Sequence, residues 1–309
     1  MTSREALVAT AGETIAKGSK SFHLASRLFA RETRERAWLL YAWCRACDDL
    51  MDGQRLGRRA ARHFDAGERL AYVREQTARA LAGRPARDMP FDALAIVVRE
   101  CAIPERFVAD HLEGFAMDAR GWRPRGEADM LCYCYHVAGA VGCMMAVVMG
   151  IDPDEEETLD RAADLGIAFQ LANIARDLSE DDAAGRCYLP LEWLAEMDVP
   201  PGQHMKPPYR EAMAALARRL AELAERYRAS ARRGAARLPF RARWAVLAAA
   251  NIYGEIAREV ARRGAHAWDR RVVIPRPRKV GLALKALGQA RGRPPPDPGR
   301  DGLWTRQRD

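Results

Sequence analysis

The sequence contains little of what builds β-sheets. Val, Ile and Thr are sparse, whereas Ala, Leu, Arg and Glu are common, and this bias favours helix over strand. Alternating strand patterns bounded by turn residues are hard to find, and no segment repeats at a fixed period. The sequence therefore predicts an all-α protein and argues against a sandwich, a barrel or a repeat array.

The cysteines and the N-terminal segment argue against a secreted protein. Seven cysteines are an odd number, and their spacing is not that of a small disulfide scaffold. Residues 1–22 contain no apolar run followed by a small-residue cleavage site. A reducing compartment fits best, so we expect a cytoplasmic protein.

Common cofactor motifs are also missing. No GxGxxG follows a strand and no P-loop is present, so we predict no NAD(P)H site. The six histidines form no HExxH pair. Cys44 and Cys47 have the spacing of a redox dithiol, but that motif needs a βαβ context. We interpret both as small core or cavity residues.

One apolar run is long. It extends from Leu131 to Ile151, interrupted only by His136, and could span a bilayer by length. However, it contains three glycines, has acids at both ends and lacks flanking Lys or Arg to set an orientation. We interpret it as a helix buried on all sides within a bundle, with a membrane span as the alternative.

Positive charge is concentrated near the C-terminus. The net charge is +8, and eleven basic but only three acidic residues follow from Arg270 onward. Such a segment could contact nucleic acid, an anionic membrane or a phosphorylated ligand, or could simply be solvated. Because it contains three consecutive prolines, we expect residues 291–309 to be a basic, proline-rich, disordered tail.

Helical periodicity covers most of the chain. We expect helices at about 4–17, 34–52, 58–82, 91–100, 105–118, 128–150, 155–179, 208–233, 241–264 and 279–290. The proline-rich stretch between Glu180 and Pro208 predicts a loop. No internal linker is evident, so we expect one domain over residues 1–290.

The first functional pattern is an acidic stripe on an expected helix. Tyr41, Arg45, Asp48 and Asp52 fall at i, i+4, i+7 and i+11, which places them on one face. Two carboxylates one turn apart can share a hard cation.

A second stripe follows more than a hundred residues later. Gln170, Asn173, Asp177 and Asp181 again share one helix face. An apolar stripe lies beside them, rotated by roughly a quarter turn; it consists of Ile167, Leu171, Ile174 and Leu178. The oxygen ligands therefore flank the core-facing edge, where a solvated acidic face would point away from it.

The two stripes together indicate a site for a metal-bound diphosphate. Like charges at i, i+4 repel, so two such stripes need a compensating cation. Magnesium prefers carboxylates together with phosphate oxygens and water, and the stripes could face each other across a bundle cavity. Arg45 and Arg176 could pair with phosphate oxygens. The alternative is that both arginines merely neutralise aspartates in surface ion pairs.

These motifs resemble those of the squalene/phytoene synthase family. The resemblance rests on Asp48 to Asp52 and on Asn173-x-x-x-Asp177-x-x-x-Asp181, and extends from about residue 15 to about 280. The segments Ser19–Phe22, Tyr133–Gly142 and Gly185–Pro190 also match. One departure is Ser179, where glycine is common in the family; the acids around it are kept.

The resemblance implies a single-domain isoprenoid synthase helical bundle around a central cavity. It also implies head-to-head condensation of two allylic prenyl diphosphates through a cyclopropyl intermediate. Magnesium, with manganese as an alternative, would be bound by Asp48, Asp52, Asn173, Asp177 and Asp181.

The resemblance further assigns residues to the substrates. Those that would contact the diphosphates or the reacting carbons are Ser19, Lys20, Ser21, Tyr41, Arg45, Gln170, Arg176 and Tyr253. Among them Tyr41, Arg45 and Tyr253 are expected to be catalytic. Tyr133 and Val137 would line the cavity, Phe22 would offer an aromatic face to a carbocation, and Arg271 would reach the phosphates.

The expected reaction converts geranylgeranyl diphosphate to phytoene, without a reductant, in carotenoid biosynthesis. The alternative is a dehydrosqualene or squalene synthase that uses farnesyl diphosphate. A head-to-tail elongation enzyme would repeat Asp-Asp-x-x-Asp at the second site, where this chain has Asn173-x-x-x-Asp177. A non-catalytic nucleic-acid-binding protein would leave the acidic stripes without a purpose, so we expect no nucleic acid. The apolar product predicts loose peripheral contact with a membrane.

Overall fold

The computed structural model describes residues 3–53 and 65–308, and within them every regular element is a helix. This confirms the prediction of an all-α fold. The α-helices are α1 (Arg4–Gly18), α2 (Lys20–Ser26), α3 (Arg31–Met51), α4 (Ala66–Leu81), α5 (Met89–Cys101), α6 (Glu105–Ala119), α7 (Glu127–Cys134), α8 (Ala140–Val148), α9 (Glu156–Ala183), α10 (Leu191–Glu196), α11 (Arg210–Gly234), α12 (Phe240–Arg263) and α13 (Arg276–Arg291). A π-helical turn, η2 (Tyr135–Gly139), joins α7 to α8, and the short 3₁₀ helices are η3 (Pro207–Tyr209), η4 (Ala235–Arg237) and η5 (Gly264–His266).

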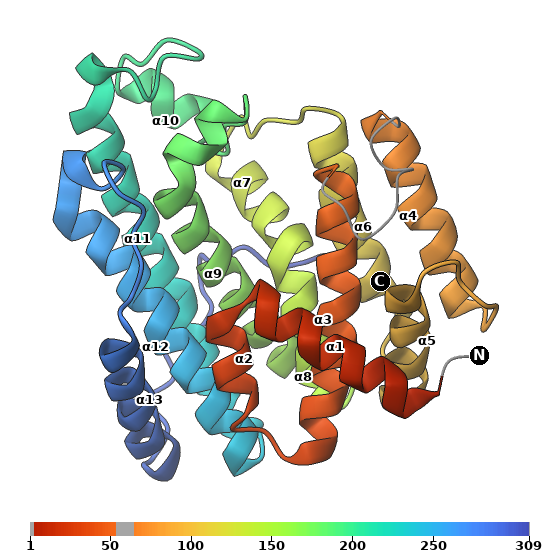
Figure 1. Cartoon of the computed structure of the whole chain (residues 1–309). Coiled ribbons are helices and arrows are strands. Elements are labelled where there is room, and N and C mark those ends of the chain that lie inside the picture. Colours follow the sequence, from red (N-terminus) through yellow and green to blue (C-terminus); the bar gives the residue numbers. More distant parts are fainter. Residues whose placement is uncertain (1–2, 54–64, 309) are drawn as a thin grey trace.

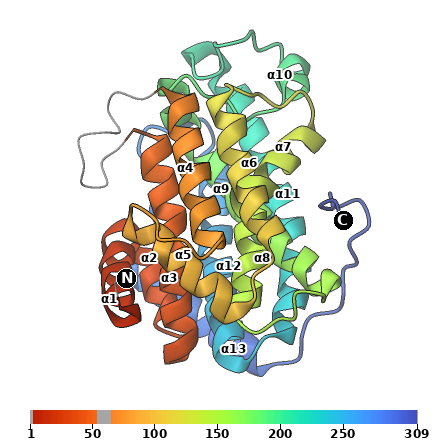
Figure 2. The same cartoon turned by 90° about the vertical axis from the view of Figure 1, so that its right-hand side faces the viewer.

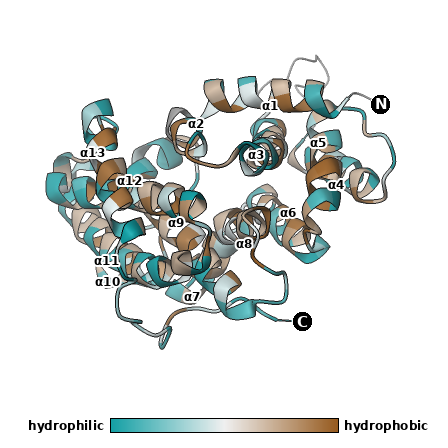
Figure 3. Cartoon of the chain, turned by 90° about the horizontal axis from the view of Figure 1, so that it is seen from below, coloured by the Kyte–Doolittle hydropathy of each residue, from teal (hydrophilic) through white to brown (hydrophobic). Residues whose placement is uncertain are grey.

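The long helix α9 lies in the middle of the bundle (Figure 1). It packs against α11 and α12 on one side and against α8 and η2 on the other. Seen along the bundle, α8 and α9 separate α3–α6 from α11–α13 (Figure 3). Because α9 has neighbours on several sides, its buried residues are distributed around the helix and include Asp160 and Asp164.

The apolar run predicted to be a core helix is the α7–η2–α8 segment. By length and composition, Glu127–Val148 is the one helix among the described residues that could cross a membrane, and 61% of its most apolar window is buried inside the protein. Its glycines lie against α9: a Cβ at Gly142 would come within 2.4 Å of the Ala162 carbonyl oxygen. This burial agrees with the interpretation as a bundle core helix.

Several helix boundaries follow from local sequence signals. Asp65 and Glu68 form a capping box at the start of α4, which satisfies free N–H groups of the first turn. The start of the helix expected at 58–82 falls in residues 54–64, outside the described part of the chain. Helices α2 and α10 were not predicted, because segments of seven and six residues are too short to show a 3.6-residue period. Helix α10 lies within the segment between Glu180 and Pro208, where the sequence predicts a loop.

The C-terminal segment differs from the expectation of a disordered tail. After α13 the chain turns back and runs beside α8 and α11 (Figure 2). We call residues 292–308 the C-terminal strap. Arg306 is 4% exposed, and Arg300 reaches the buried Asp164 with an Nη2–Oδ1 distance of 2.8 Å. The composition suggested disorder, but these arginines have acidic partners on α9 that only folding brings near them.

Candidate active site

The two acidic stripes face one another across one pocket of about 510 Å³. Asp48 and Asp52 reach it from the C-terminal end of α3. Asn173, Asp177 and Asp181 reach it from α9. The structure therefore places all five predicted metal-binding side chains on the walls of one pocket.

The carboxylates repel one another in a partly dehydrated space. Burial raises the pKa of Asp48 to about 7; Arg45 opposes this rise and Asp52 adds to it. Burial also raises the pKa of Asp181 to about 7, and the charge of Asp177 contributes further. A cation between the helices would remove this penalty, so the donor set fits a hard metal ion.

The carboxylates do not form a complete cage by themselves. In residues 3–53 and 65–308, no three His, Cys, Asp or Glu side chains lie close enough to hold a metal ion. Magnesium usually keeps several waters and takes further ligands from substrate phosphates. A pocket whose two acidic walls stand apart has room for those ligands between them.

Arginines surround the acidic walls. Arg176 forms a two-pronged contact with Asp177, with N–O distances of 2.7 and 2.5 Å. Arg271 reaches the same carboxylate, with an Nη2–Oδ1 distance of 2.9 Å. Arg45 pairs with Asp49 on its own helix and, like Arg176, lines the pocket. These guanidinium groups lie where they could exchange a carboxylate for a phosphate oxygen.

A second cavity, of about 370 Å³, is lined mainly by apolar groups. The predicted substrate residues that line it are Ser19, Phe22, Tyr41, Val137, Gln170 and Tyr253. Lys20 and Ser21 lie on α2, but their side chains are outside the described part of the structure. The cavity is therefore lined by residues of α2, α3, the α7–α8 segment, α9, α11 and α12.

Aromatic rings form part of the apolar wall. Phe169 and Tyr253 stack with ring centroids 4.0 Å apart, and Phe22 lies 5.6 Å from Tyr41. Burial raises the pKa of Tyr41 to about 12 and also raises that of Tyr253. Both phenols are therefore neutral near pH 7, and each offers a ring face and an undissociated hydroxyl.

The polar pocket and the apolar cavity meet at Gln170 and Asn173, which line both. The Asn173 amide donates to the Gln170 side-chain oxygen at 3.3 Å. An elongated ligand with an anionic head and an apolar chain would fit across this junction. Its head would lie between the acidic helices and its chain in the apolar cavity.

Comparisons with known proteins show which family the chain belongs to. The family model described as squalene/phytoene synthase matches residues 15–278. The chain belongs to the squalene/phytoene synthase family. It is 45% identical over 280 residues to a 15-cis-phytoene synthase from Pantoea ananas, covering 90% of each chain. It is 43% identical over 310 residues to a phytoene synthase from Pseudescherichia vulneris, covering 98% of this chain and 99% of that one.

A solved structure shares the architecture. The crystal structure of a dehydrosqualene synthase in complex with ligand aligns with a TM-score of 0.81 and 28% identity, covering 92% of this chain and 96% of the other. A squalene synthase from Alicyclobacillus acidocaldarius aligns with a TM-score of 0.72 and 22% identity, covering 84% and 95%. The predicted isoprenoid synthase bundle is thereby confirmed.

Sequence reasoning missed three side chains of this family member's acidic pocket. Asp118 on α6 accepts hydrogen bonds from the hydroxyl groups of Tyr133 at 3.1 Å and Tyr188 at 3.0 Å. The two tyrosine rings stack with centroids 4.7 Å apart. Arg186 lies beside them and donates to Asp52 at 3.2 Å. Arg186 and Tyr188 belong to the recognised Gly185–Pro190 motif, whereas Asp118, a single acid at a helix end, carried no such signal.

Proposed function

We propose that this chain is a 15-cis-phytoene synthase that joins two geranylgeranyl diphosphates head to head and releases two diphosphates. The observation that carries the proposal is the acidic pocket opening into an apolar cavity at Gln170 and Asn173. Relatives named phytoene synthase, matched over nearly the whole chain, favour this product over dehydrosqualene or squalene.

The acidic helices would hold the diphosphate end through magnesium, with manganese as a substitute. The ligands would be Asp48, Asp52, Asn173, Asp177 and Asp181. Bound magnesium neutralises the diphosphate and so makes it a better leaving group. The raised pKa values of Asp48 and Asp181 support this assignment, because a cation would stabilise their charged forms.

Cationic and hydroxyl side chains would orient the two diphosphates. Arg45 and Arg176 line the pocket, and Arg271 lies against Asp177. Exchange of these carboxylate contacts for phosphate contacts would hold each leaving group in line with its allylic carbon. The remaining predicted contacts are those of Ser19, Lys20 and Ser21 at the start of α2.

The apolar cavity would protect the reacting carbons from water. Departure of the first diphosphate leaves an allylic cation, which bonds to the double bond of the second substrate and loses a proton to give a cyclopropyl diphosphate. Departure of the second diphosphate, rearrangement and loss of another proton give the hydrocarbon. The rings of Tyr41 and Tyr253 would stabilise the cations, and neither step needs a reductant.

Product analysis tests the proposal directly. The purified protein, incubated with geranylgeranyl diphosphate and magnesium, should form phytoene at the same rate with and without NADPH. Farnesyl diphosphate tested in parallel should react more slowly. Preferential formation of dehydrosqualene, or of squalene only when NADPH is added, would contradict the proposal.

The metal assignment has its own test. Asp48→Asn should lower kcat/KM by about a hundredfold or more, because a ligand to the ion that neutralises the leaving group is lost. Asp182→Asn is the matched control, since Asp182 is on α9 but is not among the pocket-lining residues. Equal activity of the two variants, with circular dichroism spectra like that of the parent, would refute the assignment.

The cellular location follows from the product. We propose a cytoplasmic enzyme with loose membrane contact, because phytoene is apolar and must leave the cavity without crossing water. Flotation of the protein with liposomes should recover part of it in the lipid fraction. Complete absence from that fraction, with and without substrate, would contradict the membrane contact.

A further inference from the structure

Arg161 is the one charged side chain among the described residues that line the apolar cavity. It precedes Gln170 by nine residues on α9, which is about 13 Å along a helix axis. Gln170 marks the junction with the acidic pocket. Arg161 therefore lies toward the far end of the cavity, where the end of a bound prenyl chain would arrive.

The stem of Arg161 fills the gap between α9 and α11. It packs directly on Gly234, where an added Cβ would lie only 2.6 Å from the Arg161 Cβ. The Arg161 side chain is only 7% exposed. Its methylene groups thus form part of the cavity wall, while its charged head must find partners outside that wall.

The head of Arg161 is held by the C-terminal strap. Its Nη1 and Nη2 donate to the two Asp297 carboxylate oxygens at 3.1 and 2.8 Å, a two-pronged contact. Nη2 also donates to Glu157 at 3.2 Å, but the Glu157 side chain is 80% exposed. Asp297 supplies the better-defined partner, because two parallel bonds fix the plane of a guanidinium.

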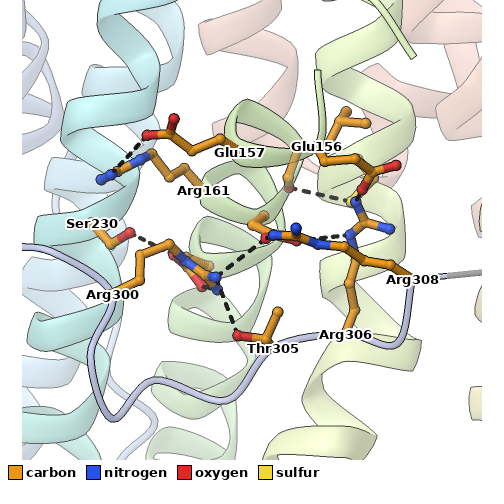
Figure 4. A network of polar contacts seen from close by, with 12 residues as sticks. Glu156, Glu157, Arg161, Ser230, Arg300, Thr305, Arg306 and Arg308 are labelled. Atoms are coloured by element: carbon orange, nitrogen blue, oxygen red, sulfur yellow. Dashed lines mark hydrogen bonds and ion pairs between the residues drawn. The ribbon is translucent and has the colours of Figure 1, made fainter. Parts of the chain in front are cut away.

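The strap is itself anchored on the same part of α9. Arg300 forms ion pairs with Asp164 at 2.8 Å and with Asp160 at 3.3 Å. The hydroxyl of Ser230 on α11 donates to Asp164 at 2.5 Å. Arg306 adds an ion pair with Asp160 at 3.0 Å. Figure 4 shows Arg300 and Arg306 reaching from the strap toward α9, with Arg161 nearby in contact with Glu157. Asp297 is therefore held in a defined place by the residues that follow it.

We propose that Asp297 is a positioning residue that locks Arg161 as the end wall of the prenyl-chain cavity, so that the C-terminal strap sets the longest chain the enzyme accepts. The inference rests on the proposed function and adds a determinant of chain length to it. Without Asp297, the guanidinium would keep only an exposed partner, and its stem could swing out of the gap between α9 and α11. The cavity would then extend toward the strap and admit another isoprene unit.

The test compares two substrates on each variant. Asp297→Ala and Arg161→Ala are assayed with geranylgeranyl diphosphate and with the diphosphate one isoprene unit longer. The quantity measured is the ratio of kcat/KM for the longer to the shorter substrate, from which any loss of folded enzyme cancels. Both variants should raise this ratio about tenfold, the scale on which an apolar pocket discriminates small differences in size.

A matched control distinguishes the Asp297–Arg161 contact from a general effect of charge on the strap. Asp301→Ala removes another exposed acid of the strap, one that forms no ion pair with the described residues, and it should leave the ratio unchanged. If Asp297→Ala kept the kcat/KM ratio of the parent protein, the role of the strap would be overturned, even if Arg161→Ala changed that ratio. If the folded parent formed no product from either substrate, the proposed function would fail instead.

Discussion

His111 is a buried base on α6. It is 4% exposed, its ring lies between those of Trp43 and Phe115, and Nδ1 is 3.2 Å from the His136 carbonyl oxygen. Burial lowers the pKa of His111 to about 4; the His136 carbonyl opposes this shift, and the His136 ring adds to it. The folded protein therefore holds this imidazole neutral in mildly acidic solution.

This neutral histidine makes stability depend on pH. Between pH 6.5 and about 4 the unfolded chain binds a proton at His111 that the folded chain does not, so the free energy of unfolding falls as the pH falls. The loss from this group should reach about 3 kcal/mol at pH 4. Urea unfolding of His111→Gln should give a shallower pH dependence over this range. An unchanged slope would contradict a neutral buried His111.

Asp118 is the acceptor for two tyrosine hydroxyls that line the acidic pocket. Asp118→Leu would leave the hydroxyl groups of Tyr133 and Tyr188 without this acceptor, at a cost of about 2–4 kcal/mol in the free energy of unfolding. Asp118→Asn keeps an oxygen acceptor of the same shape and should cost less than half as much. Chemical denaturation measures both, and equal losses in the two variants would argue against the hydrogen bonds as the cause.

At the scale of elements, the approach of η2 and α9 depends on glycine. A Cβ at Gly166 would lie 2.2 Å from the Ala138 carbonyl oxygen and 2.7 Å from the Gly139 Cα. These are backbone atoms of the α7–η2–α8 segment, which carries Tyr133 and Val137. They cannot shift to make room without displacing these two site residues. The π turn occurs at the same crossing and shifts the register of the residues after it.

Substitution of Gly166 should therefore separate two elements of the site. Gly166→Ala should lower the free energy of unfolding by about 1–3 kcal/mol, through overpacking, and should also lower kcat. Gly281→Ala on α13 is the control, because no atom lies within 4 Å of its added Cβ. That change should raise stability by up to about 1 kcal/mol. Thermal unfolding measures both changes. A Gly166→Ala variant that is not destabilised, or a Gly281→Ala variant that is, would contradict the prediction.

At the scale of the whole molecule, the strap joins the end of the chain to its central helix. Asp160 and Asp164 have side chains that are 1% and 0% exposed. Burial of such carboxylates is costly without cationic partners, and Arg300 and Arg306 supply them. The C-terminal segment is therefore attached to the core through these ion pairs, although most of its residues are exposed and it has no regular secondary structure.

Removing one strap arginine tests whether these ion pairs anchor the C-terminal segment to α9. Arg300→Ala leaves Asp164 with the Ser230 hydroxyl but without its ion-pair partner, and should cost about 3–5 kcal/mol in the free energy of unfolding. Arg308→Ala removes a partner of Asp160 whose side chain is 51% exposed. It should cost under about 1 kcal/mol. Similar values from urea titrations of both variants would mean that the strap is not anchored at Asp164.

The acidic site could be anticipated because helix periodicity converts sequence spacing directly into a shared face. Asp48 and Asp52, like Asp177 and Asp181, occupy successive turns whatever the helices pack against. Asp118 could not be found in this way, since its partners Tyr133 and Tyr188 lie 15 and 70 residues away along the chain. The contact between Asp177 and Arg271 could not be found for the same reason, since these two residues are 94 positions apart.

The sequence by itself determined the helical class, the two acidic stripes and the apolar character of the α7–α8 segment, because these depend on composition and on a fixed period of 3.6 residues. Only the tertiary structure decided that the pocket opens into the apolar cavity at Gln170 and Asn173, and that the C-terminal strap is ordered. Those outcomes depend on contacts between distant segments: Arg300 and Asp164 are 136 residues apart. Local composition predicted disorder because it carries no information about the buried acids that hold the strap in place.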